Sequence, residues 1–120
     1  MKKITAFEKA IANQVKDIRT EGINPTAFWA YRNSCSCEND LIDFNEVIWD
    51  EDIEAIAETL NNNGITEFTI SCNFSGLIRN LVAFEKVGFK MVGTTQVNAN
   101  YTDIRTGKYA KVDALHMARA

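Results

Sequence analysis

Two closely spaced cysteines are the first side chains that could act as a nucleophile, a redox pair or a soft metal site. Cys35 and Cys37 flank one serine and precede two acidic residues, and Cys72 follows much later. Zinc sites usually combine ligand pairs spaced by two or more residues from two places, and the only histidine is His116. Carboxylates beside a thiol raise its pKa, which disfavours redox chemistry. We therefore expect three reduced thiols and no metal site.

Four acidic residues cluster where a helix is expected to begin: Asp50, Glu51, Asp52 and Glu54. Such a group could bind a divalent cation or provide a carboxylate pair. The cluster lies within one helical turn, and it lacks the glycine and the interleaved oxygen ligands of a calcium loop. A solvated helix N-terminus, where acidic side chains interact favourably with the helix dipole, fits the pattern better.

Three further motifs have only part of what their chemistry requires. His116 has no nucleophile elbow before it and supports no triad. Asn73–Gly76 lies at an expected strand-to-helix turn, where free amides can hold an anion, but it has one glycine and no following lysine. Arg105–Lys108 resembles part of a phosphate loop but lies in an expected hairpin turn. The sequence thus predicts no catalytic residue and no cofactor, and leaves open whether a ligand binds at Asn73–Gly76.

The charged residues are segregated along the chain. Residues 1–32 carry six basic and three acidic side chains, residues 79–120 carry seven and three, and residues 33–78 carry ten acidic and no basic ones. The acidic block is either a solvated surface balanced in space by the basic ends or a surface that meets a positive partner. The second interpretation predicts these partner-binding residues: Glu38, Asp40, Asp43, Glu46, Asp50, Glu51, Asp52 and Glu54. Direct nucleic-acid binding is disfavoured, because it requires a basic stripe with interleaved aromatic residues.

Length and composition indicate one domain spanning residues 1–120. The hydrophobic fraction of 46% and the charged fraction of 24% are ordinary for a globular protein. Apolar runs are only a few residues long, so the sequence predicts neither a signal peptide nor a membrane span. We therefore expect a cytoplasmic protein.

The first third of the chain predicts two helices and a loop. Thr5 and Glu8 form a capping box for a helix that continues to Gly22. Asn24 caps a second, short helix over Pro25–Arg32, which carries aromatic residues expected in the core, Phe28, Trp29 and Tyr31. An exposed aromatic docking patch is the alternative for these three side chains. The polar stretch Asn33–Asp40 predicts a mobile loop.

The middle of the chain predicts an extended segment and a helix. Leu41–Ile48 alternates apolar and polar residues. Asp50 is expected to cap a helix that ends near Gly64, with these residues facing inward: Ile53, Ile56, Ala57 and Leu60.

Residues 65–97 predict a strand, a helix and a second strand, and the rest of the fold is organised around this unit. The first strand alternates Phe68, Ile70 and Cys72 against Glu67, Thr69 and Ser71. Ser75 is the expected N-cap of the helix, Gly88 its end, and one face of the helix carries Leu77, Ile78, Leu81 and Phe84. If the two strands are parallel neighbours, the connection is a right-handed crossover.

The C-terminal part predicts an antiparallel hairpin. It turns at Thr106-Gly107 and returns along Tyr109–Met117, with a bulge at Asp113-Ala114. The expected fold is therefore α+β: two N-terminal helices, then a mixed sheet of three or four strands with two packed helices and a C-terminal hairpin. An exposed edge strand in this hairpin could mediate assembly, and the oligomeric state stays open.

The segment AFEKVGFKMVG, from Ala83 to Gly93, preceded by the strand EFTIS, resembles the end of the general N-acetyltransferase fold, over about residues 50–118. This resemblance implies acyl transfer from acetyl-coenzyme A. The family's glycine-rich pyrophosphate loop corresponds to Val47–Asp52, whose acidic residues would repel a pyrophosphate. The family's tyrosine acid aligns with Phe84, which has no proton to give. The resemblance therefore extends to the fold and not to the activity.

Residues 64–119, with ITEFTIS, AFE followed three positions later by glycine, and VNANYTDIRTGKYAKVDALHM, resemble an uncharacterised family of small proteins from phages and conjugative elements of gut bacteria. Small acidic proteins of such elements often bind host machinery. This resemblance and the charge segregation together favour a non-enzymatic interaction protein of a mobile element that binds a basic protein surface, such as that of a nucleic-acid-handling defence protein. The alternative is a diverged, acyl-CoA-binding N-acetyltransferase-like protein.

Overall fold

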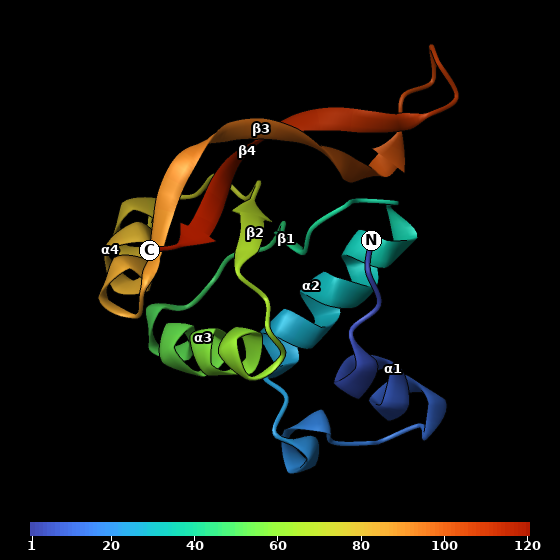
Figure 1. Cartoon of the computed structure of the whole chain (residues 1–120). Helices are drawn as coiled ribbons and strands as arrows, with labels where there is room; N and C mark the ends of the chain where they lie inside the picture. Colours follow the sequence, from blue (N-terminus) through green and yellow to red (C-terminus); the bar gives the residue numbers. More distant parts are fainter.

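Four strands form one mixed sheet, and four helices lie beneath the long hairpin of that sheet in the view of Figure 1. The computed structural model describes all residues from 1 to 120. The helices are α1 (Thr5–Ala12), α2 (Pro25–Ser36), α3 (Ile53–Asn62) and α4 (Leu77–Lys86), with two short 3-10 helices, η1 (Ile18–Glu21) and η2 (Asp50–Asp52). The strands are β1 (Asp43–Phe44), β2 (Glu67–Ile70), β3 (Phe89–Thr102) and β4 (Tyr109–Arg119). The predicted α+β class is confirmed.

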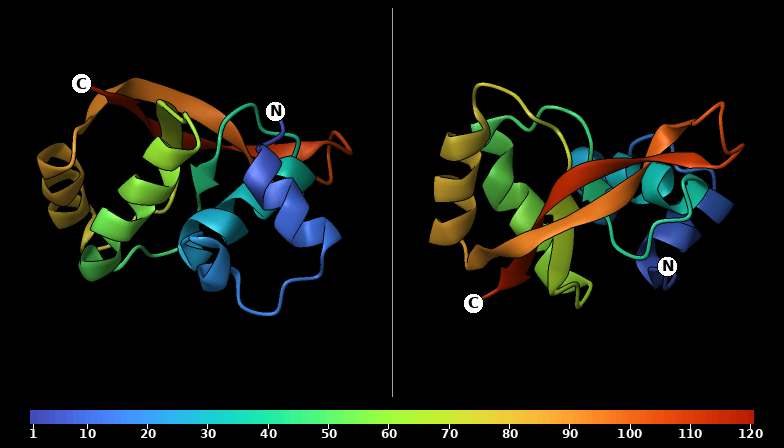
Figure 2. Two further views of the ribbon diagram at one scale, coloured as in Figure 1. Left: turned by 60° about the horizontal axis from the view of Figure 1, so that its bottom comes forward. Right: turned by 90° about the horizontal axis from the view of Figure 1, so that it is seen from above.

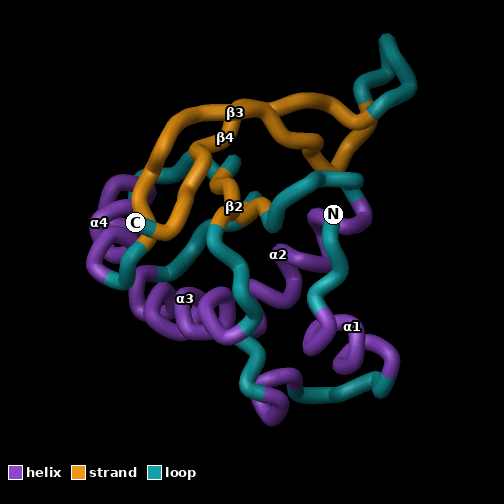
Figure 3. The backbone as a smooth tube through the Cα atoms, viewed as in Figure 1, coloured by secondary structure: helices purple, strands orange, loops and turns teal.

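The strand order in the sheet is β1-β2-β4-β3. β1 and β2 pair in parallel, while β4 runs antiparallel between β2 and β3. The two strands of the central unit, β2 and β3, are therefore parallel but are not neighbours, because the last strand of the chain lies between them. In Figure 3 the strands gather above the helices, and Figure 2 shows how strongly β3 and β4 twist around each other.

The predicted C-terminal hairpin is confirmed, and its turn includes Gly107 with a φ of +71°. The bulge at Asp113-Ala114 is wrong, because these two residues pair regularly with Gln96 and Thr95. The register shifts instead on β3, between Met91 and Gly93 and again between Asn98 and Thr102. A bulge on either strand of a hairpin can restore the alternation of side chains. The sequence pattern of β4 alone therefore could not show that the irregularities lie on β3.

The expected first helix is interrupted. α1 ends at Ala12, Gln14 adopts a left-handed φ of +50°, and the chain re-forms a helical turn only at η1. The predicted capping box is wrong, because Thr5 is the first helical residue and the N-cap, Ile4, makes no side-chain bond. Glu8 is not free to cap the helix, because its carboxylate accepts a hydrogen bond of 2.6 Å from the Tyr31 hydroxyl.

The start of α2 is as predicted, but its end is not. The Asn24 side chain accepts a hydrogen bond from the Ala27 N–H at 3.0 Å, and Pro25 occupies the first turn. The helix continues to Ser36, and the predicted mobile loop over Asn33–Asp40 is wrong. Burial explains the difference, since three polar or thiol side chains of this stretch are enclosed: Ser34, Cys37 and Asn39. Tertiary contacts thus extend a helix that local propensity would end.

α3 keeps its predicted inward face, whereas the predicted face of α4 is wrong at Ile78. Asp50 begins η2 and does not cap α3, whose N-cap is Asp52 without a side-chain bond. α4 follows Gly76, so Ser75 is not its N-cap, and Ile78 is exposed. The inner face of α4 is rotated to positions at the spacing i, i+3, i+4, i+7, namely Leu77, Asn80, Leu81 and Phe84.

One hydrophobic core joins the sheet to the helices. Phe68 of β2 lies at its centre, with ring centroids 5.3 Å from Phe44, 5.0 Å from Phe84 and 5.2 Å from Phe89. Phe7 of α1 packs edge-on against Tyr31 at 5.0 Å and so fastens α1 to α2. None of the helices combines the length and apolar character needed to cross a lipid bilayer.

Candidate functional site

The eight predicted partner-binding carboxylates occupy three different environments. Asp43 is buried, Asp50 and Asp52 are half-buried, and the others are exposed: Glu38, Asp40, Glu46, Glu51 and Glu54. The eight residues therefore do not form one uniform acidic surface.

Asp43 is not on the surface, so its predicted role in partner binding is wrong. Its side chain is in β1, 2% exposed, and it accepts hydrogen bonds from the Thr69 and Ser71 hydroxyls, each at 2.6 Å. The Ser34 hydroxyl also accepts a hydrogen bond from the Asp43 N–H at 2.8 Å. β1 is only two residues long, so this carboxylate strengthens its pairing with β2.

Glu38 and Asp40 each line a hollow that lysines from the ends of the chain also line. Glu38 lines a hollow together with Lys108 and Lys111 of the hairpin. Asp40 lines another together with Lys2 and Lys3. At these two positions the surface mixes both signs of charge, as the balanced interpretation of the acidic block predicts.

Asp50 is the only acidic residue between positions 33 and 78 that forms an ion pair with an arginine or lysine. Its carboxylate lies 3.2 Å from the Arg79 guanidinium and also accepts a hydrogen bond from the Asn80 side chain at 2.5 Å. Both partners belong to α4, so Asp50 fastens η2 to that helix. The exposed carboxylates of Glu46, Glu51 and Glu54 have no such partner.

Two exposed tryptophans line one hollow on the same side as Glu46. Trp29 of α2 is 60% exposed and Trp49, just before η2, is 65% exposed. The hollow has a volume of about 650 Å³, and the segment Asn45–Val47 lines it together with the two tryptophans. Glu46 is the only charged residue in the lining. The site therefore combines two indole rings with a single negative charge.

Local structure explains why these side chains point outward. α2 buries Ala27, Phe28, Ala30 and Tyr31 on its inner face, and Trp29 falls on the opposite side. Past β1 the chain is extended at Trp49, and buried Ile48 separates exposed Val47 from exposed Trp49. The prediction that Trp29 lies in the core is wrong, whereas Phe28 and Tyr31 are buried as predicted. Arg32, three residues after Trp29 on the same face, was the available signal for exposure.

Trp29 also borders a second hollow, of about 420 Å³, between α1 and α2. The Arg32 guanidinium lies 5.5 Å from the centre of the Trp29 ring and lines this second hollow but not the first. The indole therefore borders both hollows, and an arginine of the same chain lies over it within the second.

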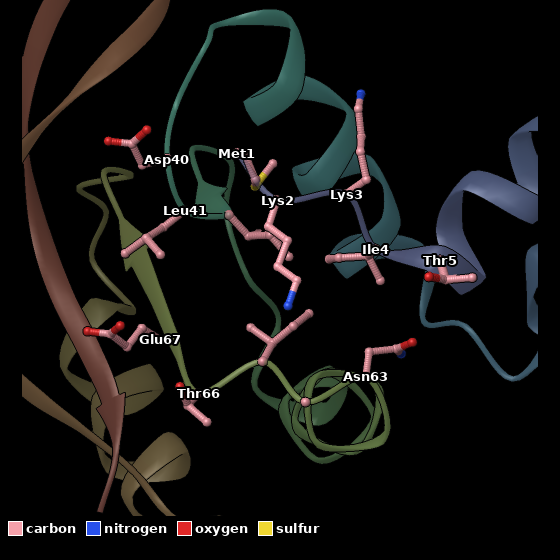
Figure 4. A pocket seen from close by; sticks show the side chains of 13 residues that line it. Met1, Lys2, Lys3, Ile4, Thr5, Asp40, Leu41, Asn63, Thr66 and Glu67 are labelled. Carbon is pink, nitrogen blue, oxygen red and sulfur yellow. The ribbon is translucent and has the colours of Figure 1, made fainter.

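A third hollow, of about 380 Å³, lies between the N-terminal residues and the start of β2 (Figure 4). Lys2 reaches across it, while Lys3 and Asp40 point away from its centre (Figure 4). The lining mixes two lysines with Asp40 and Glu67 and gathers no convergent set of polar groups. This arrangement does not resemble a binding site for one class of ligand.

The three cysteines are free thiols, and two of them share the surroundings of Asp43. Burial raises the pKa of Cys37, and the Asp43 carboxylate raises it further. Burial also raises the pKa of Cys72, followed by the carboxylates of Glu46 and Asp43. Both thiols therefore stay protonated and unreactive at neutral pH. No three His, Cys, Asp or Glu side chains lie close enough together to share a metal ion.

The turn Asn73–Gly76 is closed on one side by its own phenylalanine. A Cβ atom on Gly76 would lie 2.9 Å from the Phe74 ring, so the ring packs directly against the glycine. The Asp50 carboxylate contacts the first turn of α4 through Arg79 and Asn80. A negative charge of the protein thus already lies beside the start of this helix.

Comparison with known proteins places the chain in a family. No curated protein and no solved structure matches the chain. Residues 26–119 match the family described as Domain of unknown function (DUF7698), from the first turn of α2 to the last residue of β4. Because this match covers most of the chain, the protein belongs to the DUF7698 family.

Proposed function

We propose that this protein is a cytoplasmic, non-enzymatic interaction protein of a mobile element that binds a basic protein surface, such as that of a nucleic-acid-handling defence protein. The observation that carries the proposal is the state of Glu46, Glu51 and Glu54. They are exposed, lie within nine residues of one another along the chain, and have no arginine or lysine partner. The proposed contact face is therefore the acidic face, defined here as residues 46–54 together with Trp29.

Unpaired surface carboxylates favour association more than they favour folding. An ion pair at an exposed site stabilises a fold by only about 0–1 kcal/mol, so leaving these side chains unpaired costs the protein little. A set of like charges, in contrast, attracts an oppositely charged partner over about 10 Å at moderate salt and raises the association rate. Glu38 and Asp40 contribute less, because lysines line the same hollows and offset part of their charge.

The exposed tryptophans provide apolar contact area, which carboxylates cannot. Tryptophan is enriched among the interface residues whose truncation costs most affinity, since its large ring can be fully desolvated by a partner. Trp29, Val47 and Trp49 leave three large apolar side chains exposed around one hollow. Apolar surface with a charged rim is the usual composition of a protein-binding site.

The test compares two variants with the same net charge. The acidic-face variant combines Glu46→Gln, Glu51→Gln and Glu54→Gln. The control combines Glu21→Gln, Glu85→Gln and Asp113→Asn, which are exposed and lie outside the face. Each change removes three negative charges, so any general charge effect is shared.

The wild-type chain is used to capture partners from a host lysate at low and at high salt, and the captured protein is then identified and purified. We expect a basic protein that is released by salt. The acidic-face variant should bind this purified protein about tenfold more weakly, a loss of about 1.4 kcal/mol, and the control less than about threefold. Equal binding by the wild type and the acidic-face variant, or capture only of proteins without a basic surface, would reject the proposal.

A diverged acyl-CoA-binding protein is the second candidate. The succession β1-α3-β2-α4-β3-β4 supports it, since it contains the strand–helix–strand succession that the resemblance to N-acetyltransferases implies. The acidic η2 at the start of α3 opposes it, because Asp50, Glu51 and Asp52 would face the cofactor's phosphates. Acetyl-coenzyme A at a hundred times its dissociation constant should stabilise a binder by about 2.7 kcal/mol. An unchanged thermal midpoint with millimolar acetyl-coenzyme A would dispose of this candidate.

A further inference from the structure

We propose that the hollow between Trp29 and Trp49 binds one arginine side chain of the basic partner, an inference that rests on the proposed function. The hollow presents two indole rings and one carboxylate, that of Glu46. A cation over the face of an aromatic ring is attracted by the ring's negative centre, and tryptophan is the best such ring. A carboxylate in the same hollow can pair with the cation's charge.

Arginine fits this lining better than lysine does. Its planar guanidinium can stack on an indole while its N–H groups donate two parallel hydrogen bonds to a carboxylate. It is also more weakly hydrated than an ammonium group, so it enters an apolar hollow more readily. Asn33 and Asn45 provide amide groups in the same lining, which can bond the partner's backbone beside the arginine.

The protein already places one of its own arginines over the Trp29 ring. Arg32 lies over the Trp29 ring at 5.5 Å from its centre, within the second hollow. The hollow that Trp29 shares with Trp49 and Glu46 holds no such cation, since no arginine or lysine lines it. The partner's arginine would therefore supply the cation that this hollow lacks.

Other classes of ligand match the lining less well. An anion would meet the charge of Glu46 with no basic residue to offset it. A purely apolar side chain would cover Glu46 and leave a carboxylate without water or a partner, which is costly. A cationic side chain satisfies the rings and the carboxylate together.

The two tryptophans make the site directly observable. The chain contains two tryptophans in total, and both line this hollow. Intrinsic fluorescence and the two indole N–H signals in an NMR spectrum therefore report on this hollow without any label. The probes are three peptides that differ at one position, acetyl-Gly-Arg-Gly-amide and its lysine and citrulline analogues, titrated to tens of millimolar. Citrulline keeps the shape of arginine and removes its charge.

We expect the arginine peptide to shift both indole signals in a saturable way. The lysine peptide should bind several-fold more weakly, and the citrulline peptide at least tenfold more weakly. Glu46→Gln should weaken binding of the arginine peptide about tenfold, whereas Glu85→Gln should leave it unchanged. Indole signals that do not move, or that move equally with arginine and citrulline, would overturn the inference.

A second measurement separates this inference from the proposed function. Trp49 is 65% exposed, so Trp49→Ala should fold normally, which its thermal midpoint checks. If the hollow binds an arginine, Trp49→Ala should weaken binding to the purified partner at least tenfold. If the acidic-face variant binds the partner more weakly and Trp49→Ala binds it as well as wild type does, the arginine site is rejected and the proposed function stands. If both variants bind the partner as well as wild type does, the arginine site and the proposed function are both rejected.

Discussion

Asn39 and Asn98 form a reciprocal pair of hydrogen bonds across 59 positions of the chain. The Asn39 side chain accepts a bond from the Asn98 N–H at 2.8 Å and donates one to the Asn98 carbonyl oxygen at 3.0 Å. The Asn98 side chain in turn donates to the carbonyl oxygen of Cys37 at 2.8 Å. Asn39 thus acts as a short substitute strand on the free edge of β3. This pairing secures the chain after α2 and covers one position on an otherwise open edge.

Replacing Asn39 should loosen that connection. Asn39→Ala leaves the N–H and carbonyl of Asn98 without their partner, so we expect a loss of about 1–3 kcal/mol in the free energy of unfolding. Urea unfolding measures the loss, and hydrogen exchange should show faster exchange between residues 37 and 42. Asn62→Ala is the matched control, because Asn62 is exposed and should change stability by less than about 0.5 kcal/mol.

The pair itself is tested by a double-mutant cycle with Asn98→Ala. Asn98→Ala removes the side-chain bond to the Cys37 carbonyl and leaves the backbone bonds of Asn98 to Asn39 in place. Both changes loosen the same connection, so the two single losses should sum to more than the loss in the double variant. Strictly additive losses would show that the two side chains do not act together.

Asp43 should be a determinant of stability. Asp43→Ala leaves the Thr69 and Ser71 hydroxyls without their acceptor inside the protein, and we expect a loss of about 2–4 kcal/mol. Asp43→Asn should cost less, because one amide oxygen can still accept a bond. Denaturant midpoints of both variants check this order, with exposed Asp40→Asn as the control. An Asp43→Ala variant as stable as wild type would contradict the role assigned to this carboxylate.

The thiols of buried Cys37 and half-buried Cys72 should make the fold sensitive to alkaline pH. The pKa values of Cys37 and Cys72 are raised above their ordinary value of 9.0, chiefly by burial. The folded protein therefore holds these protons where the unfolded chain has released them. Their contribution is fully present below the ordinary thiol pKa, and the free energy of unfolding falls as the pH rises through the raised values.

The thiol contribution is isolated by comparison with a double variant. Urea unfolding of wild type and of Cys37→Ala/Cys72→Ala is measured at about pH 7 and about pH 10, on either side of the ordinary thiol pKa. Wild type should lose more stability between the two than the double variant does. Equal losses would assign the alkaline sensitivity to other groups, such as Tyr31, whose pKa is also raised by burial and by Glu8.

Tyr31 should stabilise the junction of α1 and α2 through its hydroxyl. This group donates to the Glu8 carboxylate at 2.6 Å and accepts from the Ile4 N–H at 3.2 Å. Tyr31→Phe keeps the ring against Phe7 and removes both bonds, so we expect a loss of about 1–3 kcal/mol. Thermal unfolding of this variant is compared with that of Tyr101→Phe, whose ring is 59% exposed. Equal midpoints for the two variants would contradict the expectation.

Features governed by neighbours in the chain were predictable. Asn24 and Pro25 predict the start of α2. The spacing of Ile53, Ile56 and Leu60 predicts the buried face of α3. Gly107 predicts the hairpin turn. Each depends on interactions within a few residues, which a single sequence displays directly. The acidic block is equally visible, because charge is a property of residue types.

Features that depend on distant segments were not predictable. The insertion of β4 between β2 and β3, the burial of Asp43 and the anchoring of Asn39 by Asn98 each require a partner more than 25 positions away. The same holds for the candidate site, since Trp29 and Trp49 lie on different elements and share a hollow only after folding. Local patterns therefore determine which segments become helix or strand and where charge accumulates. Long-range packing decides which polar groups are enclosed and which aromatic rings stay exposed, because it alone brings the partners within contact distance.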